Sequence, residues 1–115
     1  MSLDQIIAFC ESLPGTEAIS KIGHHLTYNV ASKSFIWLSQ DQNPIPCDFK
    51  CNQEDFYELS ERDGFGPAPY VGRFGWIRCE NIELLNPEDS DRFIRRSYDL
   101  ICDKLSAKLK LKLLK

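Results

Sequence analysis

Apolar and polar positions recur along this chain with two different periods, and each period predicts one type of element. Near the N-terminus, over residues 3–13, the apolar side chains recur at helical spacing. Ser2 and Gln5 form a capping-box pattern at the start of this segment. Pro14 and Gly15 follow it and end the helix. The pattern therefore predicts an amphipathic first helix.

The middle of the chain changes to the period of a strand. Alternation over residues 25–31 predicts a half-buried strand, and the apolar run 35–38 predicts a second one after a short polar turn. A third strand is expected over 45–51, where apolar and charged residues alternate. Asn52 then begins a second helix, 52–62, with acidic residues in its first turn.

Residues 64–77 form a segment rich in glycine, proline and aromatic residues. Glycine tolerates positive φ, and the residues Tyr70-Val71 and Trp76-Ile77 favour strands. The segment therefore predicts a β-hairpin with Arg73 near its tip and two large aromatic residues on its arms.

The last helix is expected over 87–108. Pro87 occupies the first helical position after Asn86, and an apolar stripe follows. The whole chain, 1–115, is then one α+β domain with three helices and a five-stranded, mainly antiparallel sheet, in the order α-β-β-β-α-β-β-α. A lysine- and leucine-rich end begins at about residue 106.

Charge is distributed unevenly. The formal net charge is −3, with −7 on residues 1–100 and +4 on residues 101–115. An acidic body opposes strong nonspecific association with nucleic acids, whereas the basic end adds a local positive patch. The chain has no apolar run long enough to span a membrane and no signal peptide at its N-terminus, so we expect a cytoplasmic protein without membrane contact.

Candidate chemistry is sparse. The five cysteines are an odd number without a secretion signal, so we expect reduced thiols that bind no metal. His24 and His25 are the only histidines, and no nucleophile is linked to them by spacing. We therefore expect neither enzymatic activity nor a cofactor.

Several short motifs, taken in their order along the chain, are similar to those of one known family. They are Leu13-Pro14-Gly15-Thr16, the stretch Tyr28-Asn29-Val30-Ala31-Ser32-Lys33-Ser34-Phe35, then Phe49-Lys50-Cys51, Pro67-Ala68-Pro69-Tyr70, Gly75-Trp76-Ile77, Ser97-Tyr98 and Lys104-Leu105. Together they resemble the MmcQ/YjbR family of small bacterial proteins, from the first helix to Leu105. The resemblance implies a CyaY-like fold and a DNA-binding protein in which two β-hairpins act as a double wing.

The resemblance also suggests which residues would contact DNA. Lys33 and Arg73, at the two hairpin turns, would meet phosphates, and Lys50 or Arg78 would support them. Trp37, Tyr70 or Trp76 would stack on an unpaired base. Binding would be weak and nonspecific. Solvation alone also accounts for basic residues at hairpin tips.

A glycine pair often precedes the family's turn lysine; here the pair is Ala31 and Ser32, which leaves the direction of Lys33 undecided. The alternative function is a small protein-interaction or dimerisation module that uses an aromatic sheet face lined by Trp37, Trp76, Phe35 and Tyr70.

Overall fold

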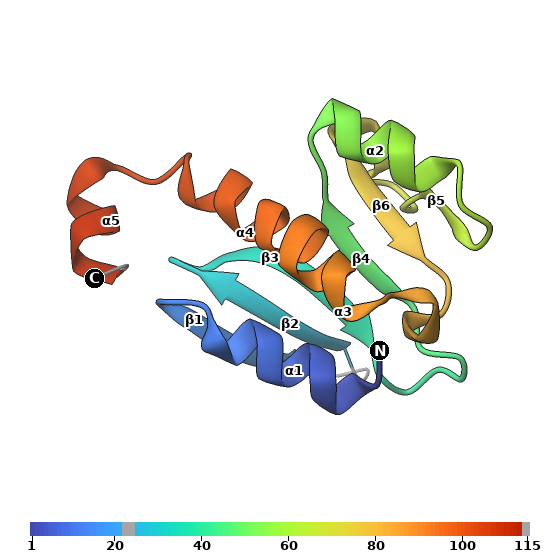
Figure 1. Cartoon of the computed structure of the whole chain (residues 1–115). Coiled ribbons are helices and arrows are strands. Elements are labelled where there is room, and N and C mark those ends of the chain that lie inside the picture. The colour runs from blue at the N-terminus through green and yellow to red at the C-terminus, as the bar shows by residue number, and fades with distance from the viewer. Residues whose placement is uncertain (22–24, 114–115) are drawn as a thin grey trace.

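The centre of the molecule is a six-stranded sheet in which every neighbouring pair of strands is antiparallel (Figure 1). The computed structural model describes residues 1–21 and 25–113. The strands are β1 (Thr16–Lys21), β2 (His25–Val30), β3 (Lys33–Ser39), β4 (Cys47–Lys50), β5 (Phe65–Pro67) and β6 (Trp76–Cys79), in the spatial order β1-β2-β3-β4-β6-β5. The expected α+β class and antiparallel sheet are confirmed.

The expected number of five strands is wrong, because the sequence pattern did not indicate β1. This strand forms the edge of the sheet and pairs only with β2. None of its residues 16–20 is buried, and Ile19 is its only large apolar residue. A strand at the edge of a sheet that buries no side chain needs no alternation of apolar and polar residues. The hydrophobic pattern of the sequence therefore does not indicate β1.

Four helical segments accompany the sheet, where we expected three. They are α1 (Leu3–Ser12), α2 (Gln53–Ser60), a continuous run made of α3 (Pro87–Asp89), a π-helical turn (Ser90–Ile94) and α4 (Arg95–Cys102), and finally α5 (Ala107–Leu113). The expected helix over 87–108 is thus interrupted after Cys102. Ser106 starts the new helix, because its hydroxyl accepts a hydrogen bond from the Leu109 N–H at 3.2 Å.

The predicted N-terminal caps of the first two helices are confirmed. The Gln5 N–H donates to the Ser2 hydroxyl at 3.1 Å, and the Ser2 N–H donates to the Gln5 side chain at 2.8 Å. The Asp55 N–H donates to the Asn52 side chain at 2.7 Å. These local contacts fix where each helix begins, which is why the sequence alone located them.

The hydrophobic core lies between the sheet and the helices α1 and α4, which cross the same face (Figure 1). Phe93 and Tyr98, expected on the apolar stripe of the last helix, are buried. The Tyr98 ring packs edge-on against Phe35 with 5.4 Å between ring centroids. Phe35 is the extra residue of a β-bulge in β3. The consecutive residues Tyr28 and Asn29 of β2 pair with Ile36 and Ser34, so Phe35, which lies between those two partners, has no partner of its own.

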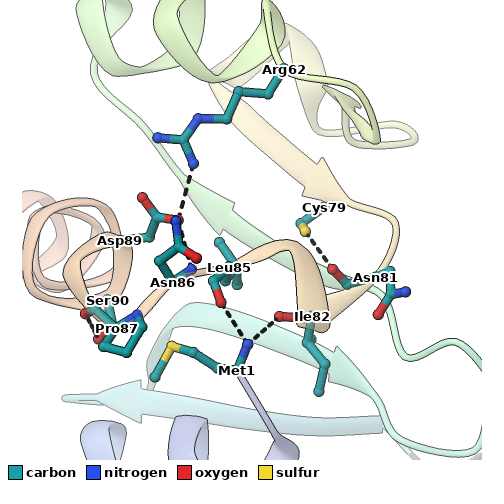
Figure 2. Close-up of polar contacts among 10 residues, drawn as sticks. All are labelled: Met1, Arg62, Cys79, Asn81, Ile82, Leu85, Asn86, Pro87, Asp89 and Ser90. Atoms are coloured by element: carbon teal, nitrogen blue, oxygen red, sulfur yellow. Dashed lines mark hydrogen bonds and ion pairs between the residues drawn. The ribbon is translucent and has the colours of Figure 1, made fainter.

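A network of polar contacts holds the start of the last long helix in place (Figure 2). The Asp89 carboxylate accepts from Arg62, just after α2, at 3.0 Å and from the Asn86 N–H at 2.8 Å. The Met1 ammonium group donates to the carbonyls of Ile82 and Leu85 at 2.9 and 2.6 Å. Segments distant in sequence are therefore joined beside this helix start.

Candidate functional site

Three of the candidate basic residues lie at one end of the sheet. β3 begins at Lys33, β4 ends at Lys50, and the loop that carries Arg73 leads into β6. Because the strands are antiparallel, the beginning of β3 lies beside the end of β4, and Lys50 pairs with Trp76 at the beginning of β6. We call this region, defined by Lys33, Lys50 and Arg73, the cationic end.

The turn before Lys33 keeps a conformation that glycine adopts most easily. Ala31 has φ of 50° and Ser32 has φ of 67°, and two positive φ values at the centre of a two-residue hairpin are typical of a type I′ turn. The Ser34 hydroxyl donates to the Asn29 side chain at 2.9 Å across the hairpin. Lys33 is solvent-exposed at the end of this turn.

Lys50 lies in a more crowded setting than Lys33. It is half-buried, and its backbone N–H donates to the Ser97 hydroxyl at 3.0 Å. The nearby side chain of Lys104, and in addition burial, lower the pKa of Lys50 to about 8. The positive charges of the two lysines repel each other, and an anion placed beside them would stabilise the charged form of both. Lys104 was not among the predicted residues, because its position here depends on tertiary packing.

The hairpin over 64–77 forms, but with a different first arm. Within this hairpin, the strand paired with β6 is β5, whereas Tyr70 lies in the connecting loop with φ of 66° and is 95% exposed. Pro67 and Pro69 provide no N–H donors, which ends the ladder before Tyr70. The expectation that Tyr70-Val71 forms an arm is therefore wrong.

Arg73 occupies the middle of a 3₁₀ turn, Gly72–Phe74, immediately before β6. It is exposed, and its guanidinium lies 4.8 Å from the centroid of the Phe74 ring. Among the described residues, no carboxylate lies within 4.0 Å of it. The other five arginines all have such a partner: Arg62 with Asp89, Arg78 with Asp48, Arg92 with Glu58 and Asp55, Arg95 with Asp99, and Arg96 with Asp55.

Arg78, also a candidate residue, is already engaged by the fold. It lies on the sheet face opposite α1 and α4, where β6 pairs with β4. Its Nε and Nη2 atoms donate to the two carboxylate oxygens of Asp48 at 2.8 and 3.0 Å, and Asp48 is buried. This bidentate contact leaves Arg78 less free than Arg73 to bind a phosphate.

Trp76 packs beside a second tryptophan. Its ring lies 5.8 Å from that of Trp37, centroid to centroid, at an interplanar angle of 53°. Trp37 is 40% exposed. The pair lies next to the Asp48–Arg78 contact and presents an aromatic surface beside the cationic end. The expectation that Phe35 lines the same face is wrong, because Phe35 is buried in the core.

Asp55 is a buried carboxylate that sequence reasoning assigned only to the first turn of α2. Its Oδ2 has no hydrogen-bond partner among the described residues, and the nearest cations, Arg92 and Arg96, are 3.9 Å away. Desolvation raises the pKa of Asp55 against the opposing effect of Arg96 and Arg92. Since both arginines lie on the last long helix, Asp55 joins α2 to that helix electrostatically.

The cysteine thiols are all buried and unpaired. Burial raises the pKa of Cys10 and of Cys51 to about 12. In the part of the chain that the structure describes, no three His, Cys, Asp or Glu side chains are grouped as metal ligands would be. His25 contacts the Ser39 hydroxyl through Nδ1 at 3.2 Å, and His24 lies outside the described residues.

Over residues 1–21 and 25–113, none of the helices is both long and apolar enough to cross a membrane.

Fold and site define a small α+β protein whose antiparallel sheet carries helices on one face and a cationic end built from three separate segments. The YjbR family model matches residues 11–100, and the chain belongs to this family. The resemblance based on short motifs is thereby confirmed.

The fold is similar to the crystal structure of Deinococcus radiodurans protein DR2400, which contains the family-model domain DUF419. The TM-score is 0.83 and the identity is 19%, over 96% of this chain and 86% of that chain. No curated protein shows significant similarity to the chain. The structural likeness supports the architecture described above.

Proposed function

We propose that this protein is a non-enzymatic DNA-binding protein that contacts phosphates through the cationic end. The observation that carries the proposal is the position of Arg73. It is the one arginine among the described residues without a carboxylate within 4.0 Å, and it lies at the same end of the sheet as Lys33 and Lys50. Cations that the fold does not neutralise are those available to phosphate oxygens.

The two hairpin turns then act together. Lys33 ends one turn and Arg73 precedes the second arm of the other, so both meet the phosphate backbone, with Lys50 between them in the strand order. Trp76 and Trp37 supply an aromatic surface beside these cations. Arg78 supports the sheet through Asp48 instead of contacting DNA.

The affinity should be modest. Residues 1–100 carry a net charge of −7, which repels the DNA backbone at long range. Contacts to phosphates without base readout give nonspecific dissociation constants of roughly 10⁻⁴–10⁻⁶ M at physiological salt. We therefore expect weak binding that decreases steeply as salt is added.

Fluorescence anisotropy with a labelled duplex and a labelled single strand, at low and moderate salt, tests the proposal. The double change Lys33→Ala and Arg73→Ala should weaken binding for all sequences and flatten the salt slope by about two units, one for each phosphate that the variant no longer binds. The matched control is Arg92→Ala with Arg95→Ala, which removes two arginines that already have carboxylate partners.

Two results would contradict the proposal. One is the absence of wild-type binding to either probe at low salt. The other is binding that survives the Lys33 and Arg73 changes and disappears when residues 106–115 are removed, which would assign it to the lysine-rich end.

The second candidate function is protein interaction or self-association through the Trp37–Trp76 surface. The exposure of Trp37 on the face opposite α1 and α4 favours it. Sedimentation equilibrium at micromolar concentration tests this: a dimer that Trp37→Ala converts to a monomer would support the interaction module over DNA binding.

A further inference from the structure

A hollow of about 360 Å³ opens next to the cationic end, between the first turn of α2 and the loop before β6. This volume falls within the usual range of small-ligand sites, roughly 300–1,000 Å³. The α2 side contributes Asn52, Gln53, Phe56 and Tyr57, and the loop side contributes Arg73 and Phe74. The hollow thus combines three aromatic rings, one guanidinium and two side-chain amides; the Asn52 oxygen also accepts the cap hydrogen bond of α2, which leaves its NH2 group and the Gln53 amide for a ligand.

The two walls of the hollow are held at a fixed separation. The Cys51 N–H donates to the Gly75 carbonyl at 2.8 Å, which joins the end of β4 to the loop. Gly75 has φ of 87°, and a Cβ there would lie 2.9 Å from the Cys51 carbonyl oxygen. The backbones can approach this closely only because position 75 is glycine.

Two of the lining rings are more exposed than their size would lead one to expect. Tyr57 is 64% exposed and Phe74 is 59% exposed, and they come from opposite walls. Large exposed aromatic side chains that gather around one concavity are typical of a binding site. Neither ring packs in the hydrophobic core, so packing of the core does not explain why aromatic residues occupy these positions.

We propose that this hollow takes one unpaired nucleotide of a DNA strand held at the cationic end. The inference rests on the proposed function and specifies its ligand as single-stranded DNA. Base heterocycles stack on aromatic rings, amides hydrogen-bond to base edges, and a guanidinium binds phosphate. These three requirements match the aromatic, amide and guanidinium groups around the hollow.

Continuity with the cationic end favours this ligand. Lys50 directly precedes Cys51 in the floor of the hollow, and Trp76 directly follows Gly75. A strand whose phosphates lie against Lys50 and Arg73 therefore passes the mouth of the hollow. In an intact duplex the bases are stacked and paired and cannot enter, so the geometry favours single strands.

The test uses a 12-nucleotide single strand with one internal 2-aminopurine and the matching duplex, with wild-type protein, three single variants and the double variant Lys33→Ala with Arg73→Ala. Phe74→Ala and Tyr57→Ala each remove one lining ring. Tyr70→Ala is the matched control, since Tyr70 is 95% exposed and does not line the hollow. Anisotropy reports affinity, and the 2-aminopurine emission reports stacking of the base on protein.

Wild-type protein should bind the single strand more tightly than the duplex, and its binding should change the 2-aminopurine emission. Phe74→Ala and Tyr57→Ala should each weaken single-strand binding by about 5- to 150-fold, the range for removal of one base–aromatic stack. Duplex binding should be unchanged in both, and Tyr70→Ala should alter neither by more than about twofold.

The same measurements separate nucleotide binding in the hollow from DNA binding at the cationic end. If both ring variants bind the single strand like wild type while Lys33→Ala with Arg73→Ala weakens it, the cationic end binds DNA and the hollow does not. Equal weakening of duplex and single-strand binding by Phe74→Ala also overturns the hollow as a nucleotide site. Absence of wild-type binding to both probes overturns both proposals.

Discussion

Asp48 and Arg78 face each other across β4 and β6 and form a bidentate contact at 2.8 and 3.0 Å. Asp48 is buried, and Arg78 supplies two of its hydrogen bonds. Because this contact already neutralises Arg78, the phosphate contacts that we propose are limited to Lys33, Lys50 and Arg73.

The first prediction follows from this pair. Arg78→Ala leaves a buried carboxylate without its charged donor, and hydrogen bonds to charged groups contribute about 1.5–3 kcal/mol. We expect a decrease of that size in the free energy of urea unfolding, with no change in the salt slope of DNA binding. A slope reduced by one unit would show that Arg78 itself contacts a phosphate.

A second prediction concerns the hydroxyl of Ser97. It donates to the Phe35 carbonyl at 2.7 Å and accepts from the Lys50 N–H at 3.0 Å, so it links α4 to two strands. Ser97→Ala should reduce stability by about 1–3 kcal/mol, since it removes the partner of two backbone groups. Ser60→Ala is the control, because that serine is exposed. Equal melting temperatures for Ser97→Ala and wild type would contradict this role.

The type I′ turn gives a third prediction, of opposite sign. Ala31 and Ser32 both have positive φ, which costs an ordinary L-residue about 1–2 kcal/mol and glycine almost nothing in strain. After allowing about 0.5–1 kcal/mol for glycine's extra entropy in the unfolded chain, Ser32→Gly should stabilise the protein by about 0.5 kcal/mol. Ser34→Gly, within β3, should destabilise it. A lower melting temperature for Ser32→Gly would mean that the turn has another form.

The buried thiols give the fourth prediction, which concerns pH. Burial raises the pKa of Cys10 to about 12 and that of Cys79 to about 11, whereas a thiol in the unfolded chain has a pKa of about 8.5. Between about pH 9 and 11 the unfolded chain releases protons that the folded one retains, so stability should fall as pH rises through this window and be fully present below it. Lys50 has the opposite effect on stability, because its pKa is lowered to about 8 in the folded protein, but it is one group against several thiols.

Urea unfolding at pH 7.5 and pH 10.5 checks the fourth prediction, and a water-soluble thiol reagent provides a second readout. The reagent should label the thiols only after unfolding, because all five are buried. Rapid labelling of the native protein, or equal stability at the two pH values, would be inconsistent with this account.

Local rules predicted the parts of the fold that depend on neighbouring residues. The caps at Ser2 and Asn52 and the stripe that contains Phe93 and Tyr98 were all found from the sequence. The edge strand β1 was missed because it buries no side chain over residues 16–20. The first arm of the hairpin was predicted at Tyr70-Val71 from strand propensity alone. Pro67 and Pro69 have no N–H to donate to a strand ladder, and this ends the pairing before Tyr70.

The candidate site was predictable only as separate residues. Lys33, Lys50 and Arg73 come from three segments, and the register of β3, β4 and β6 brings them to one end. The pairing of Arg78 with Asp48 and the approach of Lys104 to Lys50 depend on tertiary packing, which no local spacing encodes. The hollow next to α2 likewise exists only once the loop and the helix are assembled.

Binding of DNA at the cationic end can be located by titrating ¹⁵N-labelled protein with a short single strand and following the amide signals by NMR. We expect the signals of residues 32–35, 50–57 and 72–76 to move and those of α1 and β1 to stay in place. Shifts confined to α5, or no shifts at low salt, would contradict binding at that end.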